Sequence, residues 1–383
     1  MMSKRVLPAA VAFAALLSTS PGGQQPPAKQ HFEIPPNTWV KADVTFLKPD
    51  HIPDAQWVTT DGYSGSTFRP DTGTVIWRTG IRSKTLGLTP GFYGNATLEW
   101  DPTSDVVRTL DVQDEWGGGS YGGARLLEGF AANPQPCPRH TYDGLTYVPE
   151  TKSLYLMLGA FGRMSGGKAT DQAKAQLAVD ARSTWRYSFD GGKWHRIDDS
   201  IRRFWSSVYT VSSYESHLRY WPAENLLLYL DDKGRHYATF DLKTERWSKG
   251  ELKNDCPMRL YNARSTWDAR RGLWVFRLGP QLCTFDPTTA TFDSLPAPYP
   301  MPDEEKDPRR VTKGVTCISR HDVYLIAGPT GNDTYAFDPN SKTWRRIDGG
   351  DLAMVNGYME YDPASDLAVM VYQHQAYRFR YVP

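Results

Sequence analysis

The chain has 383 residues, and its aromatic content of 13% includes 13 Trp and 21 Tyr beside 32 Gly and 28 Pro. This usage favours many short strands and tight turns over long helices. The formal net charge is +1, so no overall electric field would recruit nucleic acid, and we expect no nucleic-acid partner.

The N-terminus has the pattern of an export signal. Lys4 and Arg5 precede an apolar run, Val6 to Leu17, and small residues and a Pro-Gly-Gly triplet follow it. We therefore expect a signal peptide over residues 1–23 and a secreted or periplasmic protein. The run is shorter than the roughly 20 residues that span a bilayer, so we expect no transmembrane anchor. Residues 24–35 form a polar leader segment.

A hairpin theme recurs along the rest of the chain, and its clearest copy is TYAFDPNSKTW, from Thr334 to Trp344. An aromatic strand runs into a turn that opens on an aspartate, and a return strand carries tryptophan in the clearest copies. An aspartate at this place can accept backbone N–H bonds of the turn. The turn aspartates of the copies are Asp101, Asp190, Asp241, Asp286 and Asp338.

A second hairpin theme precedes each of these copies, as in TFRPDTGTVIW and EYDPASDLAVM. Two consecutive hairpins make a unit of four antiparallel strands, and repeated units of this kind predict a β-propeller. The first theme occurs five times and the second six times, so the sixth unit lacks its last strand. The stretch Pro36–Lys41 resembles Lys342–Arg345, which lies on such a last strand. We therefore predict an all-β, six-bladed propeller over residues 36–383 whose last blade is closed by the N-terminal strand.

This pattern resembles kelch-type propellers, in outline the propeller domain of galactose oxidase-like proteins. The resemblance rests on an aromatic pair across the outer hairpin, Tyr187 with Trp194 and Tyr335 with Trp344, and on the stretch PCPRHTYDGLTYVPETKSLYLMLG at 136–159. The family's glycine doublet is present here only as single glycines. The copper-radical activity is not carried over, because no cysteine stands where it could meet a tyrosine and two histidines. We assign no cofactor and no metal, since only His140 and His217 fall on expected inner strands.

The expected connections differ strongly in length between the two faces of the ring. Turns within the hairpins are short, whereas most long segments lie on the face where the inner strands begin, and such a face usually carries binding and chemistry. One loop there, 115–130, holds five glycines together with Trp116, Tyr121 and Arg125. A short helix is expected within 168–182.

Polar residues recur near the start of each expected inner strand. A carboxylate beside a cation can bind and polarise a sugar acid, and His or Tyr can move a proton. The candidate catalytic residues are His140, Tyr142, Glu215 and Arg264. The candidate ligand-binding residues are Asp61, Trp116, Tyr121, Arg125, His217, Asn262, Lys313 and Asn356.

Three functions remain open at this point. The chain could be a monomeric, exported propeller that binds a carbohydrate or another extracellular ligand over the central channel, with face aromatics stacked on sugar rings. It could instead be a lyase or hydrolase acting on polysaccharide at the same place, or a protein-interaction module, which is a common use of kelch propellers. Polar channel strands also occur in propellers without catalysis.

The four cysteines, at 137, 256, 283 and 317, match no zinc spacing. Cys283 and Cys317 fall inside apolar strands, where a thiol acts as a small hydrophobic group. Cys137 and Cys256 each precede a proline before an inner strand, which leaves a Cys137–Cys256 disulfide open.

Overall fold

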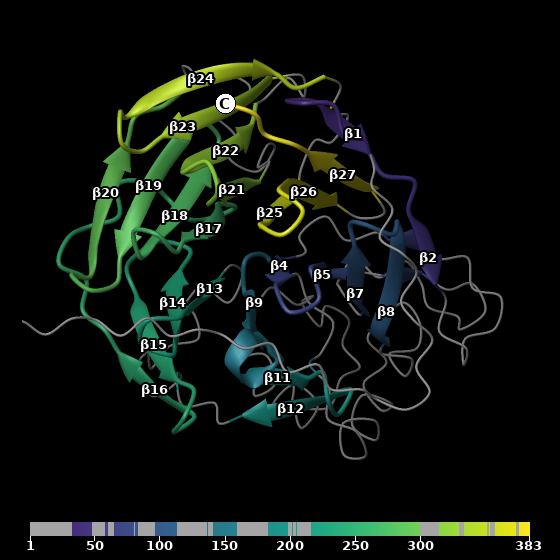
Figure 1. Cartoon of the computed structure of the whole chain (residues 1–383). Helices are drawn as coiled ribbons and strands as arrows, with labels where there is room; N and C mark the ends of the chain where they lie inside the picture. The colour runs from purple at the N-terminus through teal and green to yellow at the C-terminus, as the bar shows by residue number, and fades with distance from the viewer. Residues whose placement is uncertain are drawn as a thin grey trace, which may run out of the picture.

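The computed structural model describes residues 33–47, 58–59, 65–79, 81–82, 96–112, 136, 141–158, 183–197, 201, 204, 216–298, 314–328, 333–350, 352, 357–372 and 375–383. Six sheets, each with four antiparallel strands at its core, stand around a common centre like the blades of a propeller (Figure 1). Within these residues no α-helix occurs, and a 3₁₀ turn covers Pro149–Thr151. The predicted all-β, six-bladed propeller is confirmed.

In each blade except the last, the strands follow the chain from the centre of the ring outwards. Blade I contains β4 (Ser66–Arg69), β5 (Thr74–Thr79), β7 (Ala96–Asp101) and β8 (Val106–Val112). Blade II contains β9 (Leu145–Val148), β10 (Ser153–Met157), β11 (Thr184–Ser188) and β12 (Lys193–Ile197). Blade III contains β13 (Ser216–Trp221), β14 (Leu226–Asp231), β15 (Tyr237–Asp241) and β16 (Arg246–Lys249).

The second half of the ring repeats this order. Blade IV contains β17 (Arg264–Asp268), β18 (Leu273–Leu278), β19 (Gln281–Asp286) and β20 (Thr291–Leu295). Blade V contains β21 (Val315–Ile318), β22 (Val323–Ala327), β23 (Asp333–Asp338) and β24 (Thr343–Asp348). Blade VI contains β25 (Tyr358–Asp362), β26 (Leu367–Tyr372), β27 (Gln375–Phe379) and, from the other end of the sequence, β1 (Trp39–Lys41).

Two further elements lie outside the regular blades. The strand β2 (Thr45–Leu47) pairs in parallel with β8 as a fifth strand of blade I. The strands β3 (Val58–Thr59) and β6 (Ile81–Arg82) form a small antiparallel ribbon.

Eleven hairpins join the first to the second and the third to the fourth strands, and each has a four-residue turn. The fourth turn residue always has a positive φ, as in Gly73, Asn225 and Asp366. The carboxylates of Asp101, Asp241, Asp286 and Asp338 accept turn N–H bonds as predicted. Asp190 does not stand at that place, because the turn between β11 and β12 covers residues 189–192 and Ser188 occupies the equivalent position.

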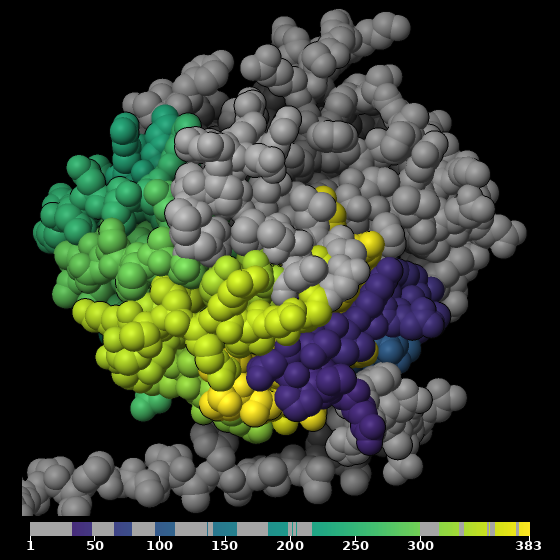
Figure 2. All heavy atoms as spheres, turned by 90° about the horizontal axis from the view of Figure 1, so that it is seen from above, coloured from purple at the N-terminus to yellow at the C-terminus, as the bar shows by residue number. Residues whose placement is uncertain are grey.

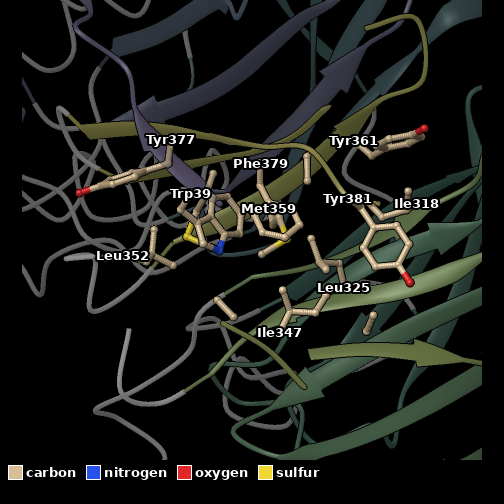
Figure 3. Packing of buried hydrophobic residues seen from close by; sticks show 14 of the residues in the cluster. Trp39, Ile318, Leu325, Ile347, Leu352, Met359, Tyr361, Tyr377, Phe379 and Tyr381 are labelled. Carbon is tan, nitrogen blue, oxygen red and sulfur yellow. The ribbon is translucent and has the colours of Figure 1, made fainter. Parts of the chain in front are cut away.

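The ring is closed by the N-terminal strand. Trp39 pairs with Phe379 and Lys41 with Tyr377, so β1 completes blade VI as predicted. In Figure 1 β1 lies beside β27, and Figure 2 shows the purple N-terminal residues against the yellow C-terminal ones. The Trp39 ring packs beside Phe379 and Met359 in the core between blades V and VI (Figure 3). Ile34, within the segment expected to be a leader, is also buried.

Tryptophans of the fourth strands fasten one blade to the preceding one. The indole of Trp247 donates to Thr184 Oγ1 at 2.9 Å, and that of Trp344 donates to the carbonyl of Pro296 at 2.7 Å. Trp194 lies opposite Tyr187, as predicted. The predicted pair of Tyr335 with Trp344 is also present, with ring centroids 6.5 Å apart, although the residue directly opposite Trp344 on β23 is Phe337.

The cysteines within the described residues are free thiols. Because Cys256 is one of them, the Cys137–Cys256 disulfide is not formed; Cys137 itself lies outside the described residues. Cys283 and Cys317 are buried, as expected from their apolar strands. No helix among the described residues is long and apolar enough to span a membrane.

Candidate functional site

The six inner strands, β4, β9, β13, β17, β21 and β25, surround the centre of the ring (Figure 1). Three residues before each inner turn, four blades carry a threonine: Thr67, Thr146, Thr266 and Thr316. The first three of these hydroxyls accept a backbone N–H from the next inner strand, at 3.0 to 3.3 Å. This position therefore fastens neighbouring inner strands to each other.

Two blades break the threonine pattern with charged residues. Arg219 takes this position in blade III and Glu360 takes it in blade VI, on the opposite side of the six-membered ring. Both are buried. A charge in such a place needs partners, because desolvation of an unpaired ion is expensive.

The partner of Arg219 is Asp143, which lies just before β9. Arg219 Nη2 is 3.3 Å from Asp143 Oδ1, and the Ser265 hydroxyl donates to Asp143 Oδ2. His217 Nδ1 also lies 3.0 Å from Oδ2, while its Nε2 lies 3.0 Å from the carbonyl of Leu260. Both imidazole nitrogens thus face oxygen atoms of the protein, so these contacts hold the ring in place.

Glu360 sits in a different environment. Its Oε1 accepts the hydroxyl of Ser66 at 2.8 Å. Burial raises the pKa of this carboxyl to about 7, against the opposing effects of the Arg219 charge and the Ser66 hydrogen bond, and the Asp143 charge adds to the increase. The centre of the propeller therefore holds a carboxyl that titrates near neutrality.

Arg264, at the start of β17, is 3% exposed. Its Cζ lies 4.1 Å from the centre of the Tyr358 ring, a cation–π distance. Its Nη1 makes only 3.4 Å contacts with the carbonyls of Asn262 and Ala263, and its Nε has no hydrogen-bond partner. It forms no ion pair with any residue of the described part of the chain.

Other buried arginines of the ring are paired. Arg78 lies 3.5 Å from Asp111 Oδ2, and Arg378 donates to Asp105. Arg277 donates to the carbonyls of Gly314 and Ala327 in the next blade, at 2.9 and 2.5 Å. Each of these arginines joins strands or blades, whereas the guanidinium of Arg264 bonds only weakly to its own segment.

Four of the predicted site residues can be placed. His217 and Arg264 lie in the buried centre, as do Tyr142 and Asn262, which both have a positive φ, 46° and 61°. The structure brings His217 to Asp143 and Arg264 to Tyr358. The remaining candidates lie outside the described residues: Asp61, Trp116, Tyr121, Arg125, His140, Glu215, Lys313 and Asn356. The 115–130 loop and the helix expected within 168–182 lie outside them too.

Four residues of this centre were not among the predicted site residues: Arg219, Glu360, Ser66 and Ser265. A signal for the first two was present, because they interrupt a column of threonines at a fixed distance from the turn. Ser66 and Ser265 carry no such signal, since their role depends on contacts between blades.

A pocket of about 300 Å³ lies on the opposite, short-turn face, where His321, Asp322, Arg345 and Tyr381 contribute to its wall. Its carboxylate Asp322 is already neutralised by Arg271, with contacts of 2.5 and 2.9 Å. Among the described residues, no group of three or more His, Cys, Asp or Glu could hold a metal ion.

No protein-family model and no curated protein matches the chain. Solved structures are similar to it. A structural genomics protein of unknown function from Bacteroides thetaiotaomicron has a TM-score of 0.50 at 9% identity, over 89% of this chain and 74% of that one. A streptogramin B lyase structure has a TM-score of 0.47 at 10% identity, over 89% and 96%. TolB from Acinetobacter baumannii has a TM-score of 0.41 at 10% identity, over 75% and 55%. At such low identity, the first of these likenesses supports the propeller fold alone.

Proposed function

We propose that this propeller binds a carbohydrate that carries a carboxylate, over the central channel on the face where the inner strands begin. Arg264 is the residue that recognises the acid group. Export through the N-terminal segment and kelch-type ancestry belong to the same proposal, and they are supported by the sequence pattern.

One observation carries this proposal, namely the buried guanidinium of Arg264. Among the described arginines at the centre, Arg219 has a carboxylate partner and Arg264 has none. A planar guanidinium suits two-point recognition of a carboxylate, and Tyr358 contacts the Arg264 guanidinium at a cation–π distance of 4.1 Å. A carboxylate ligand would supply a partner that the described part of the chain does not.

A second candidate function is an enzyme on the same ligand, and the backbone of Tyr142 favours it. Outside the hairpin turns, the described residues other than glycine with a positive φ are Asn37, Tyr142, Leu158 and Asn262. Two of these four were predicted site residues on sequence grounds. A bulky aromatic residue in this conformation is strained, and such strain clusters at functional sites. In a lyase, Tyr142 or His140 would take the proton next to a uronate whose carboxylate Arg264 neutralises.

The test is binding of uronate polysaccharides, with the neutral counterparts of the same polymers as controls. Arg264→Ala should weaken binding of the uronate polymer by roughly tenfold or more, the 1.5–3 kcal/mol typical of hydrogen bonds to charged groups. The matched control is Arg346→Ala, because Arg346 is an exposed arginine on blade V, paired with Asp333. It should bind as the wild type does.

The absorbance of unsaturated product separates the two candidates. Turnover in the wild type, lost in His140→Ala with binding kept, identifies the enzyme. Binding without turnover identifies the binding protein. Equal affinity of the wild type and Arg264→Ala for every uronate polymer, or no binding at all, contradicts the site and favours the protein-interaction module.

A further inference from the structure

Two thiols belong to the apolar cluster at the seam between blades III and IV. Cys283 is on β19 and is fully buried, while Cys256 lies in the segment between β16 and β17 and is partly exposed. Both belong to one cluster of apolar side chains, which includes Leu260 and Phe276. The turn after β14 packs closely against Cys256, since a Cβ at Gly234 would lie 2.5 Å from Cys256 Cβ.

The two thiols are not equivalent. A hydrogen bond from the Cys283 thiol lowers the pKa of Cys256, against the opposing effect of burial. The same contact, together with burial, raises the pKa of Cys283 well above its ordinary value. Cys256 is therefore the thiol that ionises first and is also the more accessible one, as a reactive cysteine requires.

We propose that Cys256 and Cys283 form a thiol modification site that closes to a disulfide by exchange with a low-molecular-weight disulfide. The Cys256 thiolate attacks one sulfur of that molecule, which forms a mixed disulfide and releases one small thiolate. Cys283 then gives its proton to solvent and attacks the Cys256 sulfur, which releases the second small thiol. Two protein thiols are oxidised and one small disulfide is reduced to two thiols.

The bond would tie the segment that leads into Arg264 to the third strand of blade IV. Closing this loop constrains the unfolded chain, so the oxidised protein should melt at a higher temperature. Cys317 offers an internal comparison. It is buried in β21, and burial and the charge of Asp268 raise its pKa.

The experiment treats the reduced full chain with oxidised glutathione and maps its peptides without reduction. We expect one internal cross-link, between the peptides that hold Cys256 and Cys283, and an increase in Tm. Cys283→Ser should stop at the glutathione adduct of Cys256, and Cys256→Ser should give neither adduct nor cross-link at this site. Cys317→Ser, the matched control, should cross-link as the wild type does.

The peptide map of the wild type alone shows whether Cys256 and Cys283 form the disulfide. A cross-link of Cys256 to Cys137 or Cys317, or an unchanged Cys256 in a natively folded wild type, overturns the proposal. An adduct on Cys283 in Cys256→Ser at the wild-type rate overturns the assigned order of attack. Circular dichroism melting of each variant confirms that it is folded before its chemistry is compared.

Discussion

The indole Nε1 of Trp39 donates a 2.8 Å hydrogen bond to Thr334 Oγ1, a residue 295 positions further along the chain. The contact joins the N-terminal strand of blade VI to the third strand of blade V. Trp247 makes the equivalent bond to Thr184 of blade II. The strand that closes the ring therefore makes the same tryptophan-to-threonine contact with the preceding blade as a fourth strand that follows its blade in sequence. This shared contact explains how a distant segment can complete blade VI.

We predict that Trp39→Ala lowers the free energy of unfolding by about 3–5 kcal/mol, because it leaves a large cavity in a core that Phe379 and Met359 share. Trp39→Phe keeps most of the ring contacts and loses the hydrogen bond, so it should lose about 1 kcal/mol plus a smaller packing term. Thermal and urea unfolding of both variants provide the measurement. Equal stability of the alanine variant and the wild type would show that β1 does not hold the ring closed.

Replacing the other fourth-strand tryptophans by alanine should lower the free energy of unfolding by different amounts. Trp247 is 1% exposed, whereas Trp344 is partly exposed at the outer edge of blade V. Trp247→Ala should therefore cost about 3–5 kcal/mol and Trp344→Ala clearly less, since the cost depends on the cavity that remains. Urea denaturation of the two variants tests the order. If Trp344→Ala abolished ligand binding without a change in stability, its structural role would be wrong.

Glu360 should make stability depend on pH in an unusual direction. Its pKa is raised from 4.5 to about 7, so the folded chain holds this proton more tightly than the unfolded chain does. The corresponding stability is fully present below pH 4.5 and is lost as the pH rises through 7, by about 3 kcal/mol in all.

Glu360→Gln keeps an acceptor for Ser66 and removes this titration. The stability of the variant relative to the wild type should therefore increase between pH 5 and pH 8. Urea denaturation at both values measures it, and a constant difference would mean that the carboxyl is ionised throughout. Asp71→Asn is the control, because Asp71 is an exposed acid paired with Arg69, outside the centre.

The architecture could be predicted because the information is local. Each hairpin can be recognised from two β-rich runs and a turn opened by a residue such as Asp338 or Pro363. The missing strand of blade VI followed from the count of five hairpins of one kind against six of the other. The site could be predicted only in part. His217 and Arg264 were found because they lie at the start of inner strands, but Asp143 and Ser265 are 122 residues apart and meet only through the ring.

The carboxylate of Asp143 contacts the side chains of Arg219, His217 and Ser265 together. Asp143→Asn keeps the shape and removes the charge, so Arg219 is left buried beside a neutral amide. Removing one partner of a buried ion pair typically costs about 3–5 kcal/mol. Arg219→Met removes the other partner. The double variant should be less destabilised than the sum of the two single variants, because neither charge is then left alone.

Asp143→Asn also tests whether Asp143 and Glu360 interact across the centre of the ring. The Asp143 charge is one cause of the raised pKa of Glu360, so Asp143→Asn should lower that pKa and move the pH-dependent loss of stability towards lower pH. Carboxyl carbon NMR of selectively labelled protein reads the Glu360 titration directly, and Glu360→Gln identifies its signal. An unchanged Glu360 titration in a folded Asp143→Asn protein would show that the two carboxyls do not interact. Additive single variants would show that Asp143 and Arg219 act independently. Coupling in both measurements would establish one continuous charge network, from Asp143 through Arg219 to Glu360, across the channel.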